Sequence, residues 1–116
     1  MQLQDLLDGQ CFERPKGTPT LSEAEVAERL PLVPDWELVE GGKAIRLTQR
    51  LRDFQAAIDF IVEVGKIAEE QGHHPDLRLY SYRTLEIEFS THSIGGHSDN
   101  DFFMAARVDA LRGRNA

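Results

Sequence analysis

The pattern of hydrophobic and polar positions predicts three helices and four strands. Apolar residues recur at helical spacing in three stretches, the longest of which follows the N-cap candidate Asp53 and ends near Gly72. Apolar and polar residues instead alternate over 45–51 and 85–89, as in strands with one wet face. The predicted elements are a helix at 22–30, strands at 36–39 and 44–51, a helix at 54–72, strands at 77–82 and 85–90, and a helix at 99–112.

This order of elements predicts an α+β fold. The two strand pairs can each form a hairpin, the first through a turn at Gly41 and Gly42. We therefore expect a four-stranded antiparallel sheet with three helices on one face, in the order α-β-β-α-β-β-α. Such a sheet leaves two unpaired edges, and pairing of edges across a twofold axis would produce a homo-oligomer.

The length of 116 residues fits one domain preceded by a short arm. Residues 1–20 lack clear periodicity, and Pro15, Gly17 and Pro19 disfavour regular structure there. We therefore predict an extended N-terminal arm over 1–20 and a folded domain over 21–116. The lone Cys11 has no neighbouring Cys or His, so a metal site or a reactive thiol is not favoured.

The net charge of −7 argues against a nucleic-acid partner, which requires clustered Lys and Arg. No apolar run is long enough to span a membrane, and no basic region followed by an apolar block marks a secretion signal. A single cysteine cannot form an internal disulfide, which fits a reducing compartment. We therefore expect a cytoplasmic protein without a nucleic-acid or membrane partner.

The histidines are the candidate chemical groups, because all four lie between His73 and His97. His73 and His74 follow the longest helix, and His92 follows the last strand, whose end we expect nearby. Imidazoles exchange protons near neutral pH, so these residues predict an acid–base site without a nucleophile. Glu69, four residues before His73, is expected to orient that ring. The alternatives are solvated histidines at a helix end, or a zinc site from Glu69, His73 and His92 whose spacing matches no standard motif.

Four other positions have structural interpretations. Asp101, three residues after Ser98, can be the second half of a helix capping box. His97 lies in a glycine-containing loop and is expected to be exposed. Trp36 is expected in the core. Gly65 would allow a neighbouring element to approach the longest helix closely.

The segment from Glu69 to Asp76, followed by Thr91-His92 and by 95–101, resembles the pterin-4a-carbinolamine dehydratase family over about residues 20–112. The resemblance implies the fold predicted above, a dimer or tetramer, and no metal or other cofactor. It also implies dehydration of 4a-hydroxytetrahydropterin to quinonoid dihydropterin, in the recycling of a pterin cofactor. The site residues that it implies are His73, His74 and His92 as catalytic groups, with Glu69, Pro75, Asp76, Thr91 and Asp101 binding the substrate.

Two positions depart from the pattern of many family members, because Leu77 replaces an aromatic residue and Asn100 replaces an arginine. The spacing from His74 to His92 is similar to a longer bacterial and plastid branch, whose members and relatives include RuBisCO assembly factors. Two hypotheses follow. The first is an enzyme in which His73 is the acid, His92 the base and His74 a ring-binding group, with an aromatic amino acid hydroxylase as possible partner. The second is a non-catalytic RuBisCO assembly chaperone or regulatory binding protein.

Overall fold

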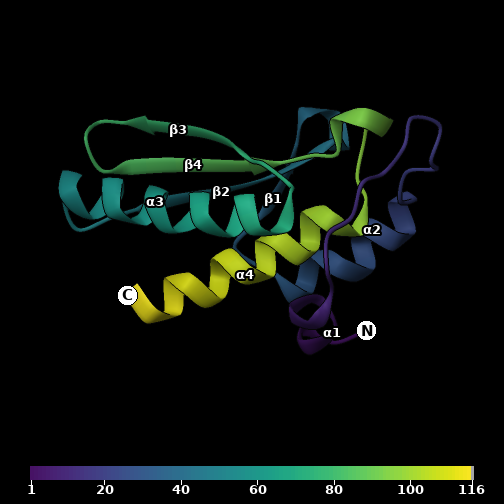
Figure 1. Ribbon diagram of the computed structural model, residues 1–116, viewed down its shortest axis with the longest axis horizontal. Coiled ribbons are helices and arrows are strands. Elements are labelled where there is room, and N and C mark those ends of the chain that lie inside the picture. Colours follow the sequence, from purple (N-terminus) through teal and green to yellow (C-terminus); the bar gives the residue numbers. More distant parts are fainter. Residues whose placement is uncertain (116) are drawn as a thin grey trace.

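Four strands form one antiparallel sheet in the order β1-β2-β4-β3. In this computed structural model, which describes residues 1–115, the helices lie on one side of that sheet (Figure 1). β2 and β4 form the centre, where Leu47 pairs with Ile87, and β1 and β3 form the edges. The fold class and the antiparallel sheet predicted from the sequence are confirmed. The strands are β1 (Glu37–Val39), β2 (Ala44–Arg50), β3 (Asp76–Tyr80) and β4 (Thr84–Phe89).

Local sequence signals set the ends of the helices. The Ser22 side chain accepts a hydrogen bond from the backbone of Glu25, and the Asp53 side chain accepts one from Ala56. Gly72 closes the longest helix in the left-handed conformation, at φ 66°, which glycine adopts without strain. The α-helices are α1 (Leu3–Asp8), α2 (Glu23–Arg29), α3 (Phe54–Gln71) and α4 (Asp99–Asn115), and short 3-10 turns are η1 (Leu30–Leu32), η2 (Glu40–Gly42) and η3 (His92–Ile94).

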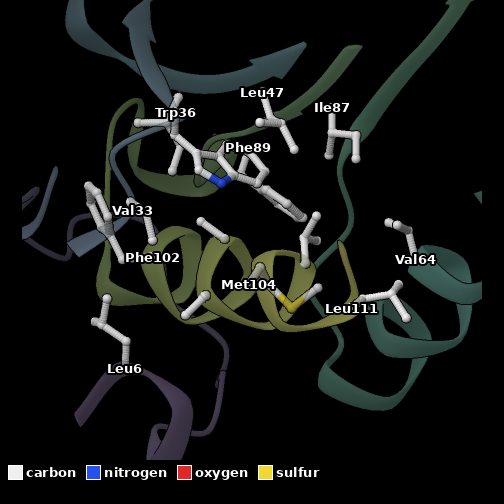
Figure 2. Close-up of a cluster of buried hydrophobic side chains, with 14 of the residues drawn as sticks. Leu6, Val33, Trp36, Leu47, Val64, Ile87, Phe89, Phe102, Met104 and Leu111 are labelled. Carbon is white, nitrogen blue, oxygen red and sulfur yellow. The ribbon is translucent and has the colours of Figure 1, made fainter. Parts of the chain in front are cut away.

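The hydrophobic core lies between the sheet and α4. Figure 2 shows side chains of the sheet, of α1 and of α3 converging on this helix. Phe89 and Phe102 are fully buried, and the Trp36 indole packs 5.8 Å from the Phe89 ring. The Trp36 N–H donates to Asp109 at 2.9 Å, so the buried indole keeps a polar partner. The prediction that Trp36 is a core residue is confirmed.

The N-terminal region differs from the extended arm that the sequence predicts. Residues 3–8 form α1, and its Leu6 side chain is fully buried against the core. Gly9 lies so close to α4 that an added Cβ would be 2.2 Å from the Phe103 ring. A six-residue helix has little stability of its own, so its packing on α4 stabilises it, and local periodicity carries little information about that packing. Residues 9–22 contain no helix or strand.

Two further expectations were wrong in detail. The third strand ends at Tyr80, because Ser81 and Tyr82 adopt positive φ values of 48° and 52° and form the turn of the β3–β4 hairpin. Gly65 has no neighbouring atom within 4 Å of an added Cβ, so no element packs against α3 in the direction of a side chain at this position. Within residues 1–115, no helix combines the length and hydrophobicity that crossing a bilayer requires.

Candidate active site

The end of α3 and the segment after β4 meet at one cavity of about 510 Å³. Three of the four histidines line it: His73 and His74 directly after Gly72, and His92 in η3. The convergence expected from the sequence is therefore present. The other lining residues are Cys11, Phe12, Glu13, Arg14, Gln71, Gly72, Ser90, Thr91, Ser93 and Asn100.

Asp101 is the buried acceptor behind the histidines. Its carboxylate is inaccessible to solvent and accepts hydrogen bonds from His73 Nε2 at 2.6 Å and from His97 Nδ1 at 2.7 Å. The Thr91 hydroxyl lies 3.2 Å from Oδ2. Burial acts to raise the pKa of the Asp101 carboxyl, but the hydrogen bonds from His73 and His97 outweigh it and hold the pKa below the usual range. Asp101 is therefore an anion at neutral pH.

The Asp101 carboxylate determines which nitrogen of His73 stays free for another contact. Because Nε2 donates to Asp101, Nδ1 is the ring nitrogen that remains available. The ring also stacks on Phe89, with centroids 6.0 Å apart and planes at 14°, and the side chain is only 11% exposed. His73 is therefore held in one orientation from two directions.

His97 is buried, contrary to the prediction that it is exposed. The residue is 2% exposed, and its ring packs 5.6 Å from the Phe102 ring. With Nδ1 donating to Asp101, its Nε2 has no hydrogen-bond partner in the described part of the chain. His97 and Asp101 are four residues apart at the start of a helix, and this spacing was the signal that could have indicated their contact.

Glu69 contacts a different histidine from the one predicted. Its carboxylate Oε2 is hydrogen-bonded to His74 Nε2, not to His73. The left-handed Gly72 redirects the chain at the end of α3, so His73 does not continue the helical face of Glu69. Both side chains of the pair are largely exposed, at 61% for His74 and 79% for Glu69.

Of the remaining predicted site residues, some line the cavity and others do not. His92 is exposed at the cavity and lies 3.4 Å from the Ser90 hydroxyl, whereas Thr91 is buried between the cavity and Asp101. Pro75 and Asp76, like Glu69, are absent from the cavity lining. Asp76 instead opens β3, where it pairs with Glu88 of β4.

One wall of the cavity was not predicted from the sequence. Residues 11–14 line it, although they belong to the segment predicted to be an extended arm. Gln71 at the end of α3 and Asn100 at the start of α4 both hydrogen-bond to this segment. Burial raises the pKa of the Cys11 thiol to about 11, so the thiol is protonated at neutral pH. No short-range pattern could have indicated contacts that join residues 60 or more positions apart.

A metal site or a second hollow would be an alternative to the histidine cavity. Within residues 1–115, no group of three or more His, Cys, Asp or Glu side chains is arranged to hold a metal ion. A second hollow of about 350 Å³ includes Asp35, Asp109 and Arg112, whose charged groups hydrogen-bond to one another. Because those groups satisfy each other, the histidine cavity is the better candidate site.

The fold and the cavity together define a class of protein: a small α+β domain with a cavity lined by imidazoles, one of which is hydrogen-bonded to a buried carboxylate. The sequence model described as "Pterin 4 alpha carbinolamine dehydratase" matches residues 19–111. The chain belongs to this family, and the resemblance seen in its motifs is confirmed.

Relatives and a solved structure agree with this assignment. The chain is 42% identical over 106 residues to a Stenotrophomonas maltophilia (strain K279a) protein named "Putative pterin-4-alpha-carbinolamine dehydratase", covering 91% of this chain and 90% of that protein. A Methylococcus capsulatus protein of the same name is 40% identical, covering 88% and 89%. The crystal structure titled "transcriptional coactivator/pterin dehydratase from Brucella Melitensis" aligns with a TM-score of 0.74 and 30% identity, over 80% of this chain and 98% of that chain. These names support the prediction of a dehydratase enzyme.

Proposed function

We propose that the protein dehydrates 4a-hydroxytetrahydropterin to quinonoid dihydropterin by histidine acid–base catalysis, in the recycling of a pterin cofactor. The observation that carries the proposal is that His73, which is hydrogen-bonded to buried Asp101, lines one cavity together with His74 and His92. Family membership supports the substrate class.

The reaction removes one water molecule from the pterin. The bond from C4a to the hydroxyl oxygen breaks, the proton on N5 leaves, and the electron pair of the N5–H bond forms the C4a=N5 double bond. An acid that protonates the departing hydroxyl and a base that takes the N5 proton lower the barrier together. Positioned groups of this kind each contribute about 10²–10⁴-fold in rate.

The contacts of the three histidines suggest a role for each. His73 has Nε2 held by Asp101 and Nδ1 available, so we assign it as the acid, which in its doubly protonated form gives the Nδ1 proton to the departing hydroxyl. His92 is exposed in η3 and bonded only weakly to Ser90, so its ring can meet N5 as the base. His74, held by Glu69 beside the cavity, is assigned to binding the pterin ring.

The test is a dehydratase assay with synthetic 4a-hydroxytetrahydropterin. We compare the parent with His73→Ala, His92→Ala and the double variant, and we expect kcat to fall by about 10²–10⁴-fold for each single change. Tyr82→Ala, at the exposed hairpin turn away from the cavity, is the matched control and should retain the parent rate. Thermal unfolding checks that all variants are folded. A double variant with the parent's turnover would refute the assignment.

A binding role without catalysis is the second candidate, and the replacement of arginine by Asn100 favours it. The Brucella neighbour is named both a coactivator and a dehydratase. The same assay separates the two functions when it is combined with a binding measurement. A folded parent that binds a dihydropterin but does not turn over the hydroxylated substrate would favour the binding role, with RuBisCO as one partner to test.

A further inference from the structure

The segment 9–14 is fastened to the two elements that carry the acid–base groups. The Cys11 N–H donates to the Gln71 side chain at 2.9 Å, two residues before His73. The Asn100 side chain, directly before Asp101, accepts from the Phe12 N–H at 3.3 Å and donates to the Phe12 carbonyl at 2.7 Å. This amide therefore pairs with the backbone of Phe12 in both directions, as a neighbouring strand would.

Anchors at both ends hold the segment in place. The Arg107 guanidinium donates to the Gly9 carbonyl at 2.6 Å, and the Ser93 hydroxyl donates to the Arg14 carbonyl at 2.6 Å. Leu6 fixes the preceding helix in the core. Because the backbone is tied at this many points, the side chains of residues 12 and 14 have defined positions at the cavity.

Arg14 is a cation with unused hydrogen-bonding capacity in the cavity wall. Its Nη2 donates to Asn100 Oδ1 at 3.1 Å, whereas its Nε is buried and has no partner. Among the described residues, no carboxylate lies within ion-pair distance of its guanidinium. Nε is closed off from solvent, whereas Nη1 has no hydrogen-bond partner among the described residues and keeps contact with solvent, so Nη1 is the donor that a ligand in the cavity can reach.

Phe12 adds an aromatic surface beside this cation. Its side chain is 60% exposed although it lines a cavity, and the Arg14 guanidinium lies 3.5 Å from the centre of its ring. A reduced pterin is a flat ring system with carbonyl and nitrogen acceptors. An exposed phenyl group and a guanidinium with free donors match those two properties.

We propose that Phe12 and Arg14 are substrate-binding residues of the pterin cavity, and that Asn100 is the residue that positions them. This inference rests on the proposed function, since it names the residues that recognise its substrate. Asn100 stands where many family members have arginine, and here its amide holds an arginine of the N-terminal segment at the same cavity. The segment thus supplies a cation and an aromatic ring to the site.

Binding of a stable 7,8-dihydropterin, followed by fluorescence, tests the inference without turnover. We expect Arg14→Ala and Phe12→Ala each to raise the Kd about 10-fold, the size of effect expected for one lost charge-assisted hydrogen bond or one ring contact. In the dehydratase assay the change should appear in KM rather than in kcat. Arg14→Lys should recover part of the affinity, because it keeps the charge but loses the planar donors. Arg52→Ala and Phe54→Ala are matched exposed controls that do not line the cavity.

Chymotrypsin cleavage between Phe12 and Glu13 tests the positioning role. Asn100→Ala should make this bond cleave faster and raise the Kd by a similar factor, and dihydropterin should slow cleavage of the parent. Arg14→Ala and Phe12→Ala variants that bind dihydropterin as tightly as the parent would overturn the inference and leave the proposed function intact. A parent that binds dihydropterin through these residues without turnover would overturn only the proposed function. A parent that binds no dihydropterin would overturn both.

Discussion

Asp101 is the residue whose chemistry the site depends on most, because its two oxygens serve three side-chain donors. His73, His97 and Thr91 all hydrogen-bond to it, although it has no contact with solvent. A carboxylate has enough lone pairs for this set, whereas an amide replaces one acceptor with a donor. The orientation of His73 therefore depends on a charge that no solvent molecule can replace.

Asp101→Asn is expected to lower kcat by about 10- to 100-fold, because His73 loses a charge-assisted hydrogen bond that fixes its ring. The free energy of unfolding should also fall by about 1–3 kcal/mol, since a buried donor is left without an acceptor. Steady-state kinetics and urea denaturation at pH 7 measure the two effects. Asp99→Asn is the control for kcat, because Asp99 pairs with Arg29 and not with a histidine. Unchanged kcat in Asp101→Asn would contradict the orienting role.

The stability contributed by Asp101 should depend on pH in a defined direction. Its pKa in the folded protein lies below the value of about 3.9 expected for an unfolded chain. The ionised form therefore adds stability that is fully present above about pH 4 and is lost as the pH falls through the folded-state pKa. We expect the difference in unfolding free energy between the parent and Asp101→Asn to shrink between pH 7 and pH 3. A difference that stays constant would mean that the ionised form is not the stabilised one.

The sequence predicted which histidines line the cavity, but it did not predict which side chains they hydrogen-bond to. The three cavity histidines follow from the motif around His73 and from the position of His92 after a strand. The partners of Glu69 and Asp101 depend on the left-handed turn at Gly72 and on the approach of α4. Both the turn and the approach of α4 depend on the tertiary structure. Helical spacing alone therefore predicted the wrong partner for Glu69.

Among the elements, α1 shows how a short segment gains structure from its neighbours. Its Leu6 side chain is buried, and Gly9 brings the chain against the Phe103 ring of α4. The longer α3 was predictable because Asp53, Gly72 and a regular apolar stripe all mark it locally. α1 lacks such signals, because α4, more than 90 residues later in the chain, supplies its contacts.

Gly9→Ala should destabilise the protein by about 1–3 kcal/mol, since its Cβ would overlap the Phe103 ring and force α1 away from α4. Gly65→Ala is the matched control on α3, where an added Cβ meets nothing within 4 Å. There the same change should raise stability by about 0.5–1 kcal/mol, because alanine favours a helix interior. Urea denaturation measures both, and equal effects of the two substitutions would contradict the close packing at Gly9.

For the whole molecule, the edges of the sheet, β1 and β3, are the surfaces through which copies of the chain can associate. β1 and β3 each have one unpaired side within the described chain, and each exposes a leucine, Leu38 on β1 and Leu77 on β3. Unpaired edges with apolar residues favour association between copies. The predicted dimer or tetramer would bury at least one of them.

Sedimentation equilibrium should therefore give a mass that is a multiple of one chain. Leu38→Lys places a lysine on β1, and Leu77→Lys places one on β3. The variant whose strand forms the interface should shift the equilibrium towards monomer, because a lysine on an edge strand opposes pairing with another strand. The two variants are controls for each other, since only one edge need be buried in a dimer. A parent that stays monomeric at all concentrations would contradict the prediction.

The candidate site is assembled from segments far apart in the sequence, and this affects when it can form during synthesis. Arg14 contacts Asn100, and Gly9 contacts Arg107, across 86 and 98 residues of sequence. A ribosome makes the N-terminal segment before α4, the helix that anchors it. A nascent chain therefore has no complete cavity until α4 has emerged, and termination before α4 would leave both Leu6 and His73 without their contacts to this helix.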